Sequence, residues 1–367
     1  MTGRRFFFFG TLLLIVSLLL WRAVPAPTVK VGVFFDSADT SEAVISRQAL
    51  QSVMLAIEYF NSRSPSFKIR PVPIFAPAPP SDLQHPGRNI AAIVTGPRIT
   101  SSPLLSQPSR RGGVPVISLA AGSLLPGKES LVFRPRPQTG GFALGCEAAR
   151  RGVKNYSVIV SGFDIGYVQE FIRDFEAGLG APPRRTMVFG GDLEKQIAHF
   201  DRIVSGMDAM LLALPDWPAT IAFREIRLRA PGIPVFASNR VISHRSPLLA
   251  SGETGNFYTS AVVPEESFMG REGFYRFVAD TYGDHIPPCI LAIGFDGVAM
   301  LSAALSRTKT PDRHLIAEAL VKLDSVDSST GPVRMDQRGD LAVKNRVMAL
   351  APGGWAPLEE TRPEGEP

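Results

Sequence analysis

Residues that build catalytic and metal centres are scarce in this chain. Of its 367 residues, 2 are cysteine and 5 are histidine. The histidines share no metal-ligand spacing, so the sequence predicts no metal site. The chain also has neither the phosphate-binding pattern G-x-x-x-x-G-K-[ST] nor the nucleophile pattern G-x-S-x-G. These absences argue against an enzyme, and we expect neither a cofactor nor a bound metal.

A strong excess of positive charge is also lacking once the N-terminus is set aside. The chain carries 39 basic and 34 acidic residues, for a net charge of +5. Arg4, Arg5 and Arg22 all precede the first acidic residue, so the excess from Pro27 on is only +2. No dense stripe of lysine and arginine with interleaved aromatics follows, and we therefore expect no nucleic-acid partner.

The N-terminus carries the longest uncharged run. Phe6 to Trp21 contains sixteen residues without a charge, preceded by Arg4 and Arg5. As a helix this run spans about 24 Å, a little short of a ~30 Å bilayer core. Residues 1–27 are therefore interpreted as a signal peptide or an N-terminal membrane anchor, both of which imply export. We expect a periplasmic or extracytoplasmic protein, anchored to the inner membrane by residues 6–21 if the leader is retained.

The two cysteines lie in apolar, helix-like segments far apart in the sequence. An exported protein can pair such residues, because its compartment permits disulfides. Cys146 and Cys289 fall in what we interpret as different lobes. The sequence therefore favours two buried free thiols over a disulfide.

Apolar strand-like runs alternate with amphipathic helix patterns along most of the chain. The runs are continuous rather than alternating, which is typical of parallel strands covered on both faces. They lie at 29–35, 67–75, 90–96, 114–119, 156–162, 185–190, 209–214, 234–238 and 257–263. Helices are expected at 138–152, 167–179, 194–205, 217–229, 266–282, 288–307 and 311–323. This alternation predicts an α/β protein with two doubly wound parallel sheets, with a crossover at 133–141.

Three segments fall outside the alternation. The stretch 331–355 is interpreted as hairpin-like, with its turn at 337–340. The proline-rich segment 76–87 predicts an extended loop in place of a helix, because proline disrupts helices. The tail 357–367 is rich in proline and glutamate and is expected to be disordered.

Polar loops follow the predicted strands at the edge where parallel sheets bind ligands. These loops are Asp36–Ser41, Gly96–Ser102, Ala120–Ser123, Gly162–Tyr167, Pro215–Trp217 and Ser238–Arg240. If two such sheets face each other, their hydroxyls and helix-start amides are suited to a carboxylate, and their aromatic residues to an apolar group. The same residue types also serve as ordinary caps and turns, and the sequence leaves that alternative open.

Four segments carry a resemblance to a known family. They are VKVGVFFDSADTSEAVISRQALQSVMLAIEYFN, GVPVISLAAGS, YSVIVSGFDIGY and STGPVRMDQRGDLAVKNRVMAL. The last contains the most specific motif, Gly-Pro-x-x-x-Asp-x-x-Gly-Asp. Together they resemble type I periplasmic binding proteins of the branched-chain amino-acid receptor group. The resemblance implies two lobes joined by three crossovers, which close over a small ligand that an ABC permease then receives.

The same resemblance implies approximate lobe boundaries and site residues. The first lobe would comprise 28–135 plus 266–328, and the second 136–265 plus 329–356. The candidate ligand-binding residues are Asp36, Ser101, Ser102, Ala120, Ala121, Ser123, Tyr167, Trp217 and Arg240. Arg240 falls at or near the position where the family has an acidic partner for the ligand ammonium. An arginine in the site would favour an anion, whereas an arginine on the surface would have no such role.

Two functions remain in view from the sequence. The first is a solute-binding protein that delivers an amino acid or small organic anion to an ABC importer. The second is a membrane-anchored ligand sensor or accessory subunit with the same fold and no transport role. A retained leader and the altered site residues would favour the second.

Overall fold

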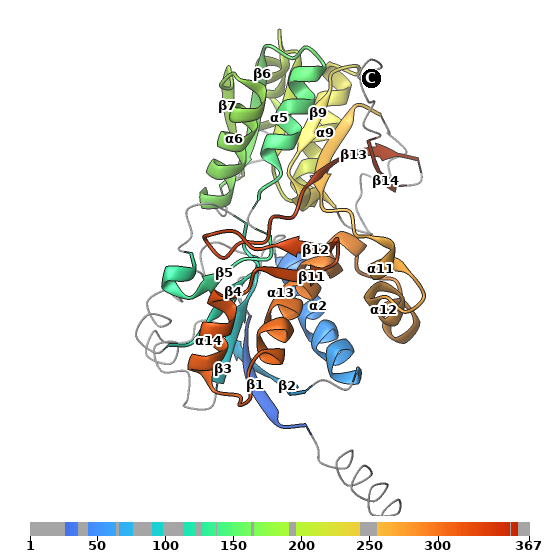
Figure 1. Ribbon diagram of the computed structural model, residues 1–367. Coiled ribbons are helices and arrows are strands. Elements are labelled where there is room, and N and C mark those ends of the chain that lie inside the picture. Colours follow the sequence, from blue (N-terminus) through green and yellow to red (C-terminus); the bar gives the residue numbers. More distant parts are fainter. Residues whose placement is uncertain are drawn as a thin grey trace, which may run out of the picture.

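Two separate β-sheets, each packed against helices, organise the chain in the computed structural model (Figure 1). The structure describes residues 26–35, 43–63, 66–75, 90–97, 113–121, 127–136, 138–162, 165–190, 196–242, 255–352 and 354–358. The expected N-terminal hydrophobic helix, the proline-rich loop and nearly all of the expected disordered tail lie outside these residues.

The first sheet is parallel throughout and has the order β2-β1-β3-β4-β5. Its strands are β1 (Thr28–Phe35), β2 (Lys68–Phe75), β3 (Ile90–Thr95), β4 (Val116–Ser118) and β5 (Val132–Phe133). From β1 the chain first adds β2 on one side and then β3 to β5 on the other, so the strand order reverses between β1 and β3. Such a reversal marks the place where a doubly wound sheet binds ligands.

The second sheet repeats this order and adds an antiparallel edge, giving β14-β13-β10-β9-β8-β6-β7. Its parallel strands are β6 (Tyr156–Ser161), β7 (Arg185–Phe189), β8 (Ala209–Ala213), β9 (Val235–Ala237) and β10 (Phe257–Ala261). The antiparallel strands are β13 (Arg346–Ala351) and β14 (Gly354–Pro357). The predicted α/β fold with two doubly wound sheets is confirmed, and the added edge makes the second sheet mixed.

Helices cover the sheets, and two short 3-10 turns follow strands. The helices are α2 (Ala43–Ser62), α5 (Gly141–Arg150), α6 (Ile165–Leu179), α8 (Phe200–Val204), α9 (Asp216–Arg229), α11 (Glu266–Met269), α12 (Phe274–Tyr282), α13 (Pro288–Ser306) and α14 (Arg313–Val321). The 3-10 turns are η2 (Lys128–Ser130) and η3 (Asn239–Val241). Helix α13 begins at Pro288, with Pro287 as its N-cap residue, because proline suits the first turn of a helix.

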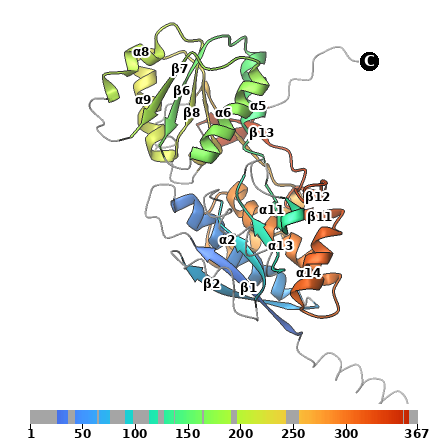
Figure 2. The same cartoon turned by 90° about the vertical axis from the view of Figure 1, so that its left-hand side faces the viewer.

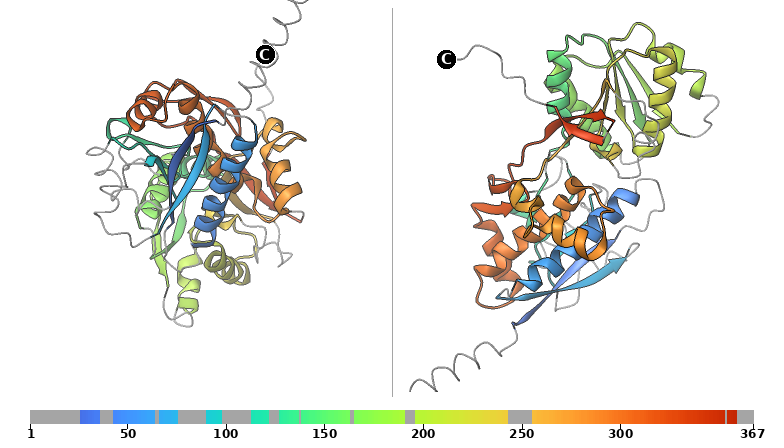
Figure 3. Two further views of the ribbon diagram at one scale, coloured as in Figure 1. Left: turned by 90° about the horizontal axis from the view of Figure 1, so that it is seen from below. Right: turned by 90° about the vertical axis from the view of Figure 1, so that its right-hand side faces the viewer.

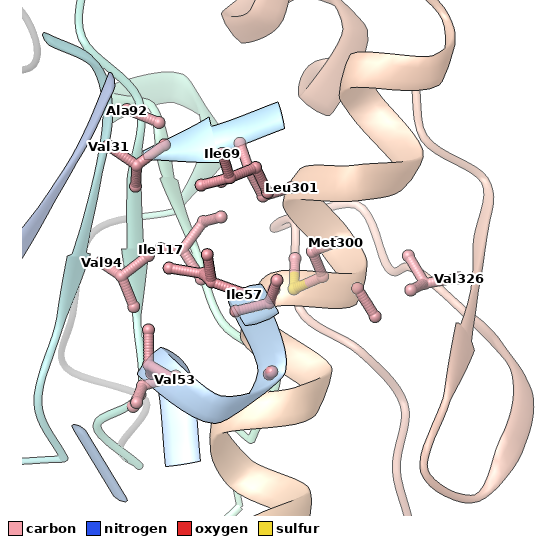
Figure 4. Close-up of a cluster of buried hydrophobic side chains, with 14 of the residues drawn as sticks. Val31, Val53, Ile57, Ile69, Ala92, Val94, Ile117, Met300, Leu301 and Val326 are labelled. Carbon is pink, nitrogen blue, oxygen red and sulfur yellow. The ribbon is translucent and has the colours of Figure 1, made fainter. Parts of the chain in front are cut away.

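The first core is built from segments far apart in the sequence (Figure 4). Val31 and Val94 come from the sheet, Ile57 comes from α2, and Met300 and Leu301 come from α13. Among the described residues, α13 is long and apolar enough to cross a membrane, but 67% of its apolar window is buried inside the protein. We call this sheet, with α2 and α11–α14, the first lobe.

The second core has two layers, one on each face of its sheet. Phe171 and Phe175 of α6 pack on one face, and Phe223 of α9 packs on the other. Helices α5 and α6 approach closely because Gly145 has no Cβ. A Cβ at this position would lie 2.2 Å from the Phe175 carbonyl oxygen. We call this sheet, with α5–α9, the second lobe.

The chain passes between the lobes at more than one point, as Figures 2 and 3 allow the reader to follow. It leaves β5 for α5, leaves β10 for α11, and returns to the second sheet through β13. Between the last two passages lies a separate two-stranded sheet, β11 (Ser325–Ser328) with β12 (Gly331–Arg334). The exact lobe boundaries given above stay a prediction.

The Gly-Pro-x-x-x-Asp-x-x-Gly-Asp segment forms a structural turn beside the first passage. Gly339 adopts a φ of +87°, and a Cβ there would lie 3.0 Å from Phe133. Arg134 pairs in parallel with Asp340 as an isolated bridge. The predicted turn at 337–340 is therefore present, but 331–355 is not one hairpin, because β12 pairs with β11 while β13 pairs with β10 and β14.

Candidate functional site

A cavity of about 90 Å³ lies between the two lobes. The first lobe contributes Pro97 after β3, Leu119 and Ala121 after β4, and Cys289, Ile290 and Ile293 of α13. The second contributes Tyr167 of α6, Pro215 after β8, Asn239, Arg240 and Ile242 after β9, and Ala261 and Val262 at the end of β10. Arg136, Gln138, Val343 and Asn345 come from the passages between the lobes. The cavity thus lies where the carboxyl ends of both sheets meet, the edge at which parallel sheets bind ligands.

Arg240 and Tyr167 form one wall of this cavity. The Arg240 Cζ atom lies 3.9 Å from the centroid of the Tyr167 ring, within the range of a cation–π contact. The Tyr167 hydroxyl donates a hydrogen bond of 3.0 Å to the Asn239 side-chain oxygen. Tyr167 is 3% exposed and stacks on Phe171 at 6.0 Å with an interplanar angle of 8°. The buried, hydrogen-bonded Tyr167 ring therefore holds the Arg240 guanidinium in position at the cavity wall.

Arg136 forms a second cationic group and connects the cavity to the core. Its Nε donates to an Asp296 carboxylate oxygen at 2.9 Å, and a terminal nitrogen donates to the Ser329 hydroxyl at 2.9 Å. Asp296 is fully buried on α13 and also accepts the Ser329 backbone N–H at 2.6 Å. Burial raises the pKa of Asp296, and Arg136 acts in the opposite direction. This network ties α13 to the first interlobe passage, through Arg136, and to the turn between β11 and β12, through Ser329.

The α13 wall of the cavity is apolar apart from one thiol. Ile290 and Ile293 lie one turn apart on this helix and face the cavity together with Cys289. Burial raises the pKa of the Cys289 thiol to about 11, with Arg136 acting in the opposite direction. A thiol with such a pKa stays protonated at neutral pH and is a poor nucleophile.

The two cysteines are both free, as the sequence favoured. Their burial differs from the prediction, because Cys289 is only half-buried and Cys146 is exposed. Cys146 lies on α5 (Gly141–Arg150), whose buried positions are Leu144, Gly145 and Ala148 among others. The apolar residues around Cys146 thus belong to the opposite side of the helix.

The structure places some of the sequence-derived candidates together and separates others. Ala121, Tyr167 and Arg240 line the cavity. Ala120 is fully buried beside it without lining it. Trp217 is 59% exposed at the start of α9 and is not among the described lining residues. Asp36, Ser101, Ser102 and Ser123 lie outside the described residues.

Several polar lining residues were not proposed from the sequence. These are Arg136, Gln138, Asn239 and Asn345. Asn239 precedes Arg240 within the loop that the sequence did single out. Arg136 and Gln138 belong to the proline-flanked crossover at 133–141. Their charged and amide side chains within a predicted crossover were the only sequence feature that could have indicated a role in the site. Asn345 had no comparable signal.

Comparison with known proteins identifies the fold. No family model and no curated sequence matches the chain. Among solved structures, the branched-chain amino-acid substrate-binding protein LivJ of Streptococcus pneumoniae, in complex with isoleucine, has a TM-score of 0.75 at 16% identity, covering 89% of this chain and 97% of that one. A substrate-binding protein of Desulfitobacterium hafniense, in complex with leucine, has a TM-score of 0.67 at 20% identity, covering 90% and 100%.

A third solved structure has a different kind of ligand. The ABC-transporter solute-binding protein of Rhodopseudomonas palustris BisB5, in complex with 3,4-dihydroxybenzoic acid, has a TM-score of 0.69 at 18% identity, covering 89% and 95%. These likenesses show that the chain has the fold of type I periplasmic binding proteins, as its sequence motifs indicated.

Proposed function

We propose that this protein is an extracytoplasmic solute-binding protein of an ABC importer. It captures a small ligand, either an amino acid or a small organic anion, between its two lobes and passes it to the permease without transforming it. The observation that carries the proposal is the cavity at the carboxyl ends of both sheets, with one arginine and one tyrosine on the same wall. Proteins of the same fold hold isoleucine or a hydroxylated benzoate.

Closure of the lobes around the ligand is the mechanism that this arrangement supports. Residues that line the cavity come from both lobes and from the passages between them, so a ligand that contacts all three favours the closed form. Ala121, Tyr167 and Arg240 are the candidates that we retain as ligand contacts. Asp36, Ser101, Ser102 and Ser123 stay predictions.

A thermal-shift screen of the purified protein against amino acids and small carboxylates tests the capture step. A ligand at one hundred times its Kd stabilises the folded state by about 2.7 kcal/mol, which is a readily measured rise in Tm. No rise with any compound would contradict the proposal.

The importer and the anchored sensor are separated by two further observations. Ligand-dependent uptake that requires this protein and neighbouring permease and ATPase genes supports the importer. Binding without any uptake, together with an intact mass that retains Phe6–Trp21, supports the sensor or accessory subunit.

A further inference from the structure

Arg136 lies at the border between the cavity and the buried network of the first lobe. It lines the cavity, although only 8% of its surface is exposed. In the sequence it stands between Pro135 and Pro137, and a residue before proline is restricted to extended conformations. The backbone that carries this side chain is therefore stiffer than that of an ordinary loop.

Two of the three guanidinium nitrogens of Arg136 are held by buried partners. Nε lies 2.9 Å from the Oδ2 atom of Asp296, and Nη2 lies 2.7 Å from the same oxygen. Nη2 also donates a hydrogen bond of 2.9 Å to the Ser329 hydroxyl. Asp296 and Ser329 are both fully buried. Because a guanidinium is planar and rigid, fixing these two nitrogens also fixes the third.

The third nitrogen, Nη1, is accessible from the cavity. Among the described residues, no group accepts a hydrogen bond from it. It is also not one of the buried side-chain atoms that lack a partner, so solvent reaches it. The thiol of Cys289, another lining residue, feels the same guanidinium: burial raises its pKa, and the charge of Arg136 acts in the opposite direction. The Arg136 charge therefore acts at the cavity wall.

We infer that Arg136 is a ligand-contact residue whose Nη1 atom binds a carboxylate oxygen of the solute, with Asp296 and Ser329 as its positioning residues. This inference rests on the proposed function and adds a contact from the first interlobe passage. A guanidinium that is already anchored loses little freedom when it binds, and a charged donor forms the stronger kind of hydrogen bond. The contact joins the solute to the segment that connects the lobes.

A double variant removes the guanidinium without leaving its counter-ion unpaired. Arg136→Gln/Asp296→Asn replaces both charges of the pair. Arg134→Gln/Asp340→Asn is the matched control, because this second buried pair also starts on the first passage and is not among the described lining residues. Circular dichroism and Tm establish that each variant is folded.

Isothermal titration of the full-length proteins at pH 7 measures the effect on binding. The probes are isoleucine, benzoate and the tightest-binding carboxylate of the thermal-shift screen. For each probe that binds the wild-type protein, Kd is expected to rise about tenfold or more in Arg136→Gln/Asp296→Asn and less than about twofold in the control.

The primary amide of each probe distinguishes a carboxylate contact from a general loss of affinity. Isoleucinamide and benzamide keep the body of the acid and lose its negative charge. The preference of the wild-type protein for the acid over the amide is expected to fall about fivefold or more in Arg136→Gln/Asp296→Asn, because the charged donor that distinguishes them is gone. A merely structural role for Arg136 would weaken acid and amide equally.

Ser329→Ala tests the positioning step and serves as the second variant if the double variant does not fold. It removes one hydrogen bond from Nη2 and leaves the ion pair of Arg136 with Asp296 in place. The Kd of the acid is expected to rise about two- to fivefold, and that of the amide is expected to stay the same.

The outcomes separate this inference from the proposed function. Equal losses of affinity in the two double variants, or an unchanged preference for acid over amide, overturn the inference and leave solute capture intact. A screen whose binding compounds all lack a carboxylate does the same. A screen without any binding compound overturns both.

Discussion

The Arg134 guanidinium and the Asp340 carboxylate form a buried, two-point ion pair between residues 206 positions apart in the chain. The Arg134 Nε atom lies 2.6 Å from one carboxylate oxygen, and its Nη2 atom donates to the other. Backbone bonds reinforce the pair, since the Leu341 N–H donates to the Arg134 carbonyl at 2.9 Å. The pair joins the start of the first interlobe passage to the segment that leads into the last.

Removing the charge of Asp340 is expected to destabilise the protein strongly. Asp340→Asn leaves the Arg134 guanidinium, 1% exposed, without its counter-ion, and such a loss typically costs about 3–5 kcal/mol. Urea unfolding followed by circular dichroism measures the change. Asp201→Asn is the control, because Asp201 pairs with Arg229 while 81% exposed, and exposed pairs contribute less than about 1 kcal/mol. Equal losses in the two variants would contradict the structural role of the buried pair.

The close approach of α5 and α6 gives a second expectation. In Gly145→Ala the new Cβ would lie 2.2 Å from the Phe175 carbonyl oxygen and 2.8 Å from the Leu179 nitrogen, so the helices must separate. We expect a loss of about 1–3 kcal/mol in the free energy of unfolding, despite the better helix propensity of alanine. Gly190→Ala is the control, since no described residue lies within 4 Å of the position of its Cβ, and its stability should be unchanged or slightly higher. Unchanged stability in Gly145→Ala would show that the helices are packed less closely.

The two thiols should differ sharply in reactivity. Burial raises the pKa of Cys289 from 9.0 to about 11, so at pH 8 its thiolate fraction is about a hundredfold below that of an ordinary thiol. Iodoacetamide at pH 8 is expected to label the exposed Cys146 first, as peptide mass spectrometry would measure. Because the folded-state pKa is raised, the contribution of Cys289 to stability is complete below pH 9 and declines as pH rises through about 11.

A variant isolates the slower thiol. In Cys146→Ser only Cys289 remains, and its labelling should rise with pH toward 11 and fall when ligand occupies the cavity. Rapid labelling of Cys289 at pH 8, or no effect of ligand on it, would contradict its position in the cavity wall.

Tyr167 is expected to act through its ring more than through its hydroxyl. Tyr167→Phe loses the 3.0 Å bond to Asn239, which costs about 0.5–1.5 kcal/mol, and keeps the surface beneath Arg240. Tyr167→Leu removes that surface as well, so ligand affinity should fall further, by more than about tenfold. Isothermal titration with the tightest-binding compound of the screen compares the variants. If Tyr167→Phe lowers ligand affinity as much as Tyr167→Leu does, the Tyr167 hydroxyl itself contacts the ligand.

Much of the fold could be predicted because its physical causes are local. Runs such as 209–214 are apolar at every position, and β8 is indeed buried throughout. The sheet-edge argument named the loops that contain Tyr167 and Arg240, and these two residues contact each other in the structure because residues after parallel strands converge at one edge. The added antiparallel edge of β13 and β14 was not predicted, since the turn at 337–340 was easier to recognise than the pairing partners of the strands beside it.

Side-chain direction was the part that the sequence could not supply. Trp217 follows β8 as closely as the argument required, but helix α9 begins at Asp216 and leaves the indole largely in solvent. Arg136 was overlooked because only the loops after strands were considered, and a charged residue in the crossover at 133–141 does not by itself show that the crossover passes a cavity wall. Both outcomes depend on how distant segments pack, which local patterns do not encode.

The position of α13 has a consequence for the order of events during synthesis of the chain. Residues 288–306 cover a sheet whose last strand ends at Phe133. The hydrophobic face that α13 covers therefore stays exposed to solvent until most of the chain has been synthesised. The parallel strands β6 to β10 of the second lobe lie closer together in the sequence and can pair earlier, before residues 346–357 add the antiparallel edge. A nascent polypeptide of this design thus exposes its N-terminal strands for a long interval, and such exposed apolar strands favour aggregation before folding is complete.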